Sequence, residues 1–196
     1  MTAPAPRRAT YEDVLKAPSH MVAEILDGQF HLSPRPAGPH CLAASVLGGE
    51  LASPFHRGRG GPGGWLIIYE PELHLGGDVL VPDIAGWRRT RLPKYPNAAF
   101  VSLAPDWICE VLSPKTHRLD RVEKRSVYAR EGVQYLWLVD PLERTLETYE
   151  LIAGRWTDTG SYSGDSKIRA VPFDAIELEL GALWEDAEQE SEGQGT

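Results

Sequence analysis

Two acidic residues stand in segments that are otherwise apolar. Asp83 directly follows a proline in the segment VPDIA (81–85), and Glu110 lies inside DWICEVL (106–112). An ionised carboxylate that is buried without a partner costs several kcal/mol. Two carboxylates about 4 Å apart also repel each other by roughly 4 kcal/mol at an effective dielectric constant near 20. A divalent cation bound by both removes that cost, and hard oxygen ligands favour Mg²⁺ or Mn²⁺ over zinc.

Taken singly, each carboxylate has a simpler interpretation, because a glutamate within a strand commonly pairs with an arginine and an aspartate after a proline commonly caps a turn. A lysine beyond the second strand makes the combination more specific. Lys124 lies in a polar, basic segment, 118–131, whose pattern predicts a helix. It points either along the sheet edge toward Glu110, or into solvent, where it pairs with Asp120 four residues earlier.

Helical spacing predicts which face of this helix is buried. At about 100° per residue, one stripe is shared by Leu119, Val122, Ser126 and Ala129. Lys124 lies off that stripe, so both of its predicted orientations stay open.

The elements that would position these residues follow from turn signals and hydrophobic runs. A short helix is predicted to begin at Thr10, and a β-hairpin at 22–32 is predicted to turn at Asp27-Gly28. Further along, the pattern predicts a helix at 40–52, a loop at 58–64, strands at 64–69, 72–75, 79–87 and 107–112, the helix at 118–131, a strand at 134–139 and a hairpin over 146–159. The strand–helix–strand crossover at 107–139 indicates an α/β or α+β sheet with helices on its faces.

The chain between its two ends is predicted to form one domain. Residues 10–184 contain no linker or internal repeat, whereas residues 1–9 and 185–196 are predicted to be flexible tails, the second because its composition is acidic and nearly free of apolar residues. No apolar run approaches the roughly 20 residues of a membrane-spanning helix, so no membrane partner is expected. The N-terminus has no signal-peptide pattern, and the expected location is cytoplasmic. Cys41 and Cys109 are predicted to be two buried free thiols.

Several segments of the chain resemble the Uma-two family of restriction endonucleases, within the PD-(D/E)xK nuclease superfamily. The resemblance spans about residues 10–184 and is carried by AEILDGQ (23–29), SPRPAGPH (33–40), VPDIAGW (81–87), PDWICEVLSPKT (105–116), LDRVEK (119–124), YAREGVQYLWLVDP (128–141) and FDAIELELGALW (173–184). It implies a restriction-endonuclease-like fold, which is a mixed β-sheet flanked by helices, with added N- and C-terminal β-hairpins.

The resemblance also implies an activity, namely Mg²⁺-dependent hydrolysis of phosphodiester bonds in DNA. Asp83 and Glu110 then match the metal ligands, and the backbone carbonyl of Val111 is a third ligand. The superfamily places its lysine two residues after the glutamate, where this chain has Leu112. The resemblance implies that the amine comes instead from the next helix, where it is that of Lys124. Two further polar positions near the same cleft are Glu24 and His40.

The departure at Leu112 keeps a second interpretation open, a catalytically silent nuclease-fold module with a binding or regulatory role. A serine hydrolase using Ser113 or Ser102 with His117 or His40 is disfavoured, because the GxSxG motif is missing. Three tryptophans, Trp65, Trp87 and Trp107, are predicted to pack in the core rather than to stack on bases. A double-strand cut needs two active sites, so a homodimer is also predicted.

A net charge of −8 argues against a surface that binds nucleic acid everywhere. Five of the negative charges lie in 185–196, however, which leaves −3 for residues 1–184. The residues predicted to grip DNA phosphates are Lys115, Arg118, Arg121 and Arg125, with a solvated basic surface as the alternative. Any DNA-binding surface must therefore be confined to a small part of the molecule.

Overall fold

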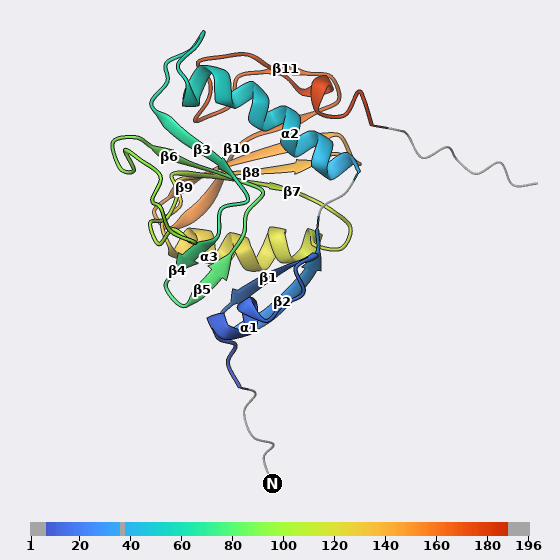
Figure 1. Ribbon diagram of the computed structural model, residues 1–196. Helices are drawn as coiled ribbons and strands as arrows, with labels where there is room; N and C mark the ends of the chain where they lie inside the picture. Colours follow the sequence, from blue (N-terminus) through green and yellow to red (C-terminus); the bar gives the residue numbers. More distant parts are fainter. Residues whose placement is uncertain (1–6, 36–37, 188–196) are drawn as a thin grey trace, which may run out of the picture.

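A central six-stranded sheet runs through the computed structural model, which describes residues 7–35 and 38–187 (Figure 1). Its strands lie in the order β10-β9-β8-β7-β6-β3. They are β3 (Trp65–Tyr69), β6 (Ile84–Arg88), β7 (Trp107–Val111), β8 (Tyr135–Asp140), β9 (Thr145–Ile152) and β10 (Arg155–Ser163). Strands β7 and β8 are parallel, and the other neighbours are antiparallel. The predicted mixed sheet is confirmed, and the predicted hairpin over 146–159 continues it as β9 and β10.

A second sheet of four strands contains the predicted N-terminal hairpin. Its order is β2-β1-β5-β4, with β1 (Met21–Leu26), β2 (Gln29–Pro34), β4 (Leu73–Leu75) and β5 (Asp78–Leu80). The hairpin turns at Asp27 and Gly28, whose φ angles are +50° and +80°. Both values are left-handed, as a two-residue turn of this kind requires, and Asp-Gly tolerates them well.

The chain leaves one sheet for the other at Pro82. The predicted single strand over 79–87 is wrong, because β5 ends at Leu80 in the four-stranded sheet and β6 begins at Ile84 in the six-stranded sheet. Proline lacks the N–H that a continuous ladder needs, so the strand is interrupted there. As a result, Asp83 lies at the junction between the two sheets.

Helices cover both faces of the central sheet (Figure 1). One face packs on α2 (Pro39–Leu51), which η1 (Ala52–His56) extends in π-helical form; the other face packs on η2 (Leu119–Lys124), also π-helical, and α3 (Arg125–Arg130). The remaining elements are α1 (Tyr11–Leu15), the short pair β11 (Lys167–Ile168) and β12 (Leu178–Glu179), and η3 (Leu180–Leu183). None of the helices in the described part of the chain is both long enough and apolar enough to cross a membrane.

Alternation along β7 decides where Glu110 points. Trp107 and Cys109 belong to the core cluster on the α2 side, whereas Ile108 and Leu112 belong to the cluster on the α3 side. Successive strand residues face opposite ways, so Glu110 shares the α3 side with Ile108 and Leu112. That cluster also takes in Leu80 from the four-stranded sheet. Glu110 is therefore enclosed by β7, the η2–α3 helix and the second sheet.

The core confirms some sequence predictions and corrects others. Trp65, Trp87 and Trp107 are buried, as predicted. Of the two cysteines, Cys109 is buried but Cys41 is exposed, so the prediction of two buried thiols is wrong for Cys41.

The predicted buried stripe of the 118–131 helix is wrong. Val122 is 59% exposed and Ser126 is also exposed, whereas the buried residues are Asp120, Lys124, Val127 and Tyr128. The buried face thus carries two charged side chains and a tyrosine, which hydrophobic spacing could not reveal.

Candidate active site

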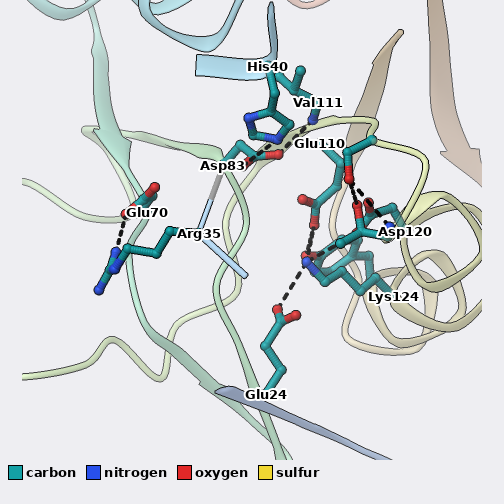
Figure 2. Close-up of polar contacts among 12 residues, drawn as sticks. Glu24, Arg35, His40, Glu70, Asp83, Glu110, Val111, Asp120 and Lys124 are labelled. Carbon is teal, nitrogen blue, oxygen red and sulfur yellow. Dashed lines mark hydrogen bonds and ion pairs between the residues drawn. The ribbon is translucent and has the colours of Figure 1, made fainter. Parts of the chain in front are cut away.

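A cavity of about 390 Å³ lies where the two sheets approach each other, and it collects the charged residues singled out in the sequence (Figure 2). Its lining includes all three predicted catalytic residues and both secondary candidates, namely Asp83, Glu110, Lys124, Glu24 and His40. They come from β1, the start of α2, the β5–β6 junction, β7 and η2. The two sheets and one helix on each face therefore all contribute to one site.

Lys124 sits at the centre of three buried carboxylates. Its Nζ lies 3.0 Å from Glu24 Oε1, 3.2 Å from Asp120 Oδ1 and 3.4 Å from Glu110 Oε1 (Figure 2). Burial alone would lower the pKa of Lys124, but the three carboxylates outweigh burial and hold that pKa well above its ordinary value. The ammonium is therefore charged. Lys124 contacts both Glu110 and Asp120, so its two predicted partners are both present.

Glu110 is held by a short hydrogen bond. The hydroxyl of Tyr128 donates to Oε1 at 2.5 Å, and both side chains are almost completely buried. Burial raises the pKa of Glu110 well above its usual range, and nearby carboxylates add to the rise although Lys124 opposes it. The contacts with Tyr128 and Lys124 both use Oε1, and no described residue donates a hydrogen bond to Oε2. Oε2 is thus available as a ligand atom.

Asp83 is fixed from two sides. The N–H of Val111, at the end of β7, donates to Oδ2 at 2.7 Å, and His40 Nε2 lies 3.2 Å from Oδ1. Burial lowers the pKa of His40, but the hydrogen bond and the charge of Asp83 outweigh burial and raise it overall. The interruption at Pro82 lets the Asp83 side chain reach the end of β7 while β6 continues in the same sheet.

The donor set fits a hard divalent cation. Five carboxyl groups and three lysine or arginine side chains line the cavity, so acidic groups are in excess there. Within residues 7–35 and 38–187, no group of three or more His, Cys, Asp or Glu side chains is arranged to hold a metal. Mg²⁺ needs no such group, because it is commonly bound by one or two carboxylates and keeps several waters. The carboxylates of Asp83 and Glu110 match that preference better than they match zinc. Val111 is not among the residues that line the cavity, so its carbonyl stays a predicted ligand.

The four predicted phosphate-binding residues do not gather in one place. Lys115 lines the cavity, and Arg118 lines a neighbouring hollow of about 420 Å³ on the other side of Ser113 and Pro114. Arg121 makes two hydrogen bonds to Glu147, at 2.7 and 2.8 Å.

Arg125 completes that set of four, and its guanidinium lies over the ring of Tyr149 at 4.0 Å. The contacts of Arg121 and Arg125 with β9 tie both residues to the fold. Binding of nucleic acid by the four residues stays a prediction.

Two residues of the site were missed in the sequence. The sequence indicates Asp120 only as a solvent-exposed partner of Lys124, and Tyr128 only as a residue that lies with Asp120 and Lys124 off the predicted stripe. A usable signal was present, because Asp120, Lys124 and Tyr128 are spaced by four residues and so share one helix face. A repeated polar spacing of this kind is as informative as an apolar one.

The serine-hydrolase alternative finds no support in the geometry. The hydroxyl of Ser113 pairs with that of Thr116 at 3.0 Å, and His117 Nε2 accepts a hydrogen bond from Arg121 at 3.0 Å. His40 is engaged with Asp83. None of these contacts joins a serine to a histidine.

Comparisons with known proteins agree with this architecture. The model of the Uma2 family, described as "putative restriction endonuclease", matches residues 9–181. Among solved structures, the chain is similar to a "putative nuclease belonging to DUF820" from Anabaena variabilis ATCC 29413, with a TM-score of 0.73 and 26% identity over 90% of this chain and 98% of that chain. A search of the curated proteins finds no match. The family match spans most of the chain, and the chain therefore belongs to the Uma2 family of restriction-endonuclease-like nucleases.

Proposed function

We propose that this chain is a Mg²⁺-dependent endonuclease that hydrolyses phosphodiester bonds in DNA. The observation that carries the proposal is the convergence of Lys124 on Glu110, at 3.4 Å, inside a cavity that also contains Asp83. A structural ion pair alone would not need a further, partly buried carboxylate in the same cavity. The family description, which concerns nucleases, supports the same class of reaction.

The metal ligands in this proposal are Asp83, Glu110 and the carbonyl of Val111, with Mn²⁺ as an alternative to Mg²⁺. When bound, the ion lowers the pKa of a water molecule and polarises a phosphoryl oxygen. His40 holds the Asp83 carboxylate through its contact at 3.2 Å, and Tyr128 holds that of Glu110 through its hydrogen bond at 2.5 Å. Both carboxylates are thereby oriented before substrate arrives, which reduces the cost of reorganisation.

Lys124 supplies the positive charge next to the reacting phosphate. Its ammonium has three donors, and the contact with Glu110 is the longest of the three that it makes. Exchange of that contact for a water or a phosphate oxygen would orient the nucleophile and stabilise charge that develops on the phosphoryl group. Leu112, which occupies the superfamily's usual lysine position, packs in the core cluster on the same side of β7 as Glu110. The amine thus reaches the carboxylate from the neighbouring helix instead of from the strand.

Cleavage of supercoiled plasmid in the presence of Mg²⁺ tests this function. We expect Asp83→Asn and Glu110→Gln each to abolish nicking and to weaken Mg²⁺ binding in a calorimetric titration. Glu147→Gln is the matched control, because Glu147 is a partly buried carboxylate with its own arginine partner outside the cavity. Cleavage that persists in the Asp83→Asn/Glu110→Gln double variant would refute the assignment. If the unaltered chain binds DNA but does not cut it with Mg²⁺ or Mn²⁺, the silent binding module is the correct interpretation.

A further inference from the structure

An arginine and a glutamate that the sequence analysis did not single out face each other at the mouth of the cavity. Arg35 directly follows β2 and Glu70 directly follows β3, and both line the same cavity as Asp83 and Glu110. Arg35 Nη1 lies 3.4 Å from Glu70 Oε2, with the two side chains 55% and 45% exposed (Figure 2). The pair is therefore accessible to a ligand that enters the cavity.

The backbone holds Glu70 beside the candidate metal ligand. Its N–H donates to the carbonyl of Asp83 at 3.0 Å. Its φ is +43°, a left-handed conformation that is uncommon for a residue other than glycine. Strained backbone of this kind persists where the surrounding structure imposes it, and it is concentrated at functional sites. Glu70 is thus tied to Asp83 through the main chain while its side chain reaches across the cavity mouth.

The ion pair between Arg35 and Glu70 is a weak one. The guanidinium makes one long contact with Glu70, and its Nε makes another at 3.4 Å to the carbonyl of Ser19. Arg121 provides the contrast, because its two short hydrogen bonds to Glu147 use the planar fork fully. Exposed single-contact pairs contribute little to stability, so Arg35 can exchange its partner easily.

We propose that Arg35 binds a backbone phosphate next to the scissile one, and that Glu70 holds the guanidinium in place until the substrate phosphate replaces it. This inference rests on the proposed nuclease function. The guanidinium fork matches two phosphate oxygens, which is a stronger arrangement than the present single contact. Lys115, in the loop after β7, lines the same cavity, so each of the two sheets supplies one cation. The substrate is then a polynucleotide, because it must carry at least one further phosphate next to the scissile one.

Binding of a fluorescent duplex oligonucleotide without metal tests the role of Arg35. We expect Arg35→Gln to weaken binding about 10-fold and to reduce the slope of log affinity against log salt concentration by about one. The matched control is Arg155→Gln, because Arg155 is exposed on β10 and lies outside the cavity. Affinity within twofold of the unaltered chain, together with an unchanged salt slope, would overturn the assignment of Arg35.

Glu70→Gln tests whether Glu70 occupies the Arg35 guanidinium before the substrate phosphate binds, and it should change the DNA affinity in the opposite direction to Arg35→Gln. Removal of the competing carboxylate should strengthen oligonucleotide binding several-fold, whereas weaker binding would overturn this role. Arg35→Gln should not weaken Mg²⁺ binding in a calorimetric titration, since no hydrogen bond or ion pair joins Arg35 to Asp83 or Glu110.

These measurements keep the two proposals separable. If Arg35→Gln weakens DNA binding in a chain that never cleaves DNA, the phosphate site stands and the nuclease function fails. If cleavage requires Asp83 and Glu110 but the DNA affinity of Arg35→Gln is unchanged, the nuclease function stands and the phosphate site fails.

Discussion

Replacing Tyr128 with phenylalanine isolates the contribution of one hydroxyl group to the site. The hydroxyl donates to Glu110 Oε1 at 2.5 Å, and Tyr128 is completely buried. Burial, with the charge of Glu110 beside it, raises the pKa of Tyr128 well above its ordinary value, so the group remains a donor at neutral pH. Phenylalanine preserves the ring packing and deletes only the hydrogen bond. A hydrogen bond to a charged acceptor contributes about 1.5–3 kcal/mol. In a chain of this length, that corresponds to a fall in Tm of about 3–12 °C.

The same substitution should weaken the metal site. Glu110 would keep only Lys124 as a described polar partner, so its carboxylate would be oriented less firmly. Loss of a residue that orients a metal ligand typically costs about 10–100-fold in metal affinity or activity. We therefore expect Tyr128→Phe to raise the Kd for Mg²⁺ and lower the rate of plasmid nicking by that factor. Differential scanning calorimetry and titration calorimetry measure the two effects separately.

Tyr149→Phe is the matched control for this experiment. The hydroxyl of Tyr149 donates to Glu147 Oε2, also at 2.5 Å, and neither residue lines the cavity. Its loss should lower Tm and leave Mg²⁺ affinity unchanged. If Tyr128→Phe likewise lowers Tm and leaves Mg²⁺ affinity unchanged, Tyr128 stabilises the fold only and the reasoning is refuted.

Three further predictions concern stability. Lys124→Met leaves buried carboxylates unpaired, so urea unfolding should show a loss of about 3–5 kcal/mol, and an unchanged midpoint would contradict the ion cluster. The hydrogen bond from Arg121 lowers the pKa of Glu147. The pair of Arg121 and Glu147 therefore stabilises the fold at pH values above 4.5, the ordinary pKa of a glutamate, and this stabilisation is lost as the pH falls below 4.5. Glu147→Gln should flatten the dependence of the unfolding free energy on pH in that range. In the same urea assay, Val127→Ala should lower the free energy of unfolding by about 1.5–3 kcal/mol, and Val122→Ala should lower it by less than about 0.5 kcal/mol. A larger loss for Val122→Ala would mean that the buried face is the one predicted from hydrophobic spacing.

The parts of the fold that the sequence predicts correctly depend on local signals. The Asp27-Gly28 turn and the helix start at Thr10 involve residues close together in the chain, and both occur as predicted. The crossover between β7 and β8 follows from two apolar strands separated by a helix that stops at Gly132, whose φ is +76°. Such features need no knowledge of distant residues.

The features that the sequence did not predict depend on distant residues. Strand β5 pairs with β1, whereas β6 pairs with β3 and β7, so the interruption at Pro82 separates two sheets that assemble from remote segments. Lys124 is buried because Glu24, a hundred positions earlier, contacts it at 3.0 Å. Hydrophobic spacing counts only apolar residues, so it places Lys124 off the predicted stripe and leaves the orientation of its side chain open. The family resemblance selected these residues as candidates, and the way they lie relative to one another required the structure.

The π-helical turn explains how three residues of this helix reach one site. In an α-helix, a spacing of four residues overshoots a full turn by about 40°, so residues at i, i+4 and i+8 spread over about 80° of the surface. Residues 119–124 instead form a π-helix, which has more residues per turn, so a spacing of four residues falls short of a full turn. In α3, the same spacing again exceeds a full turn. The two deviations oppose each other, which keeps Asp120, Lys124 and Tyr128 on the buried face together. A π-turn is less favourable than an α-turn and is frequent at functional sites. The π-turn beside Lys124 therefore lowers the local stability of the helix, and the alignment of Asp120, Lys124 and Tyr128 in one site explains why the turn is present.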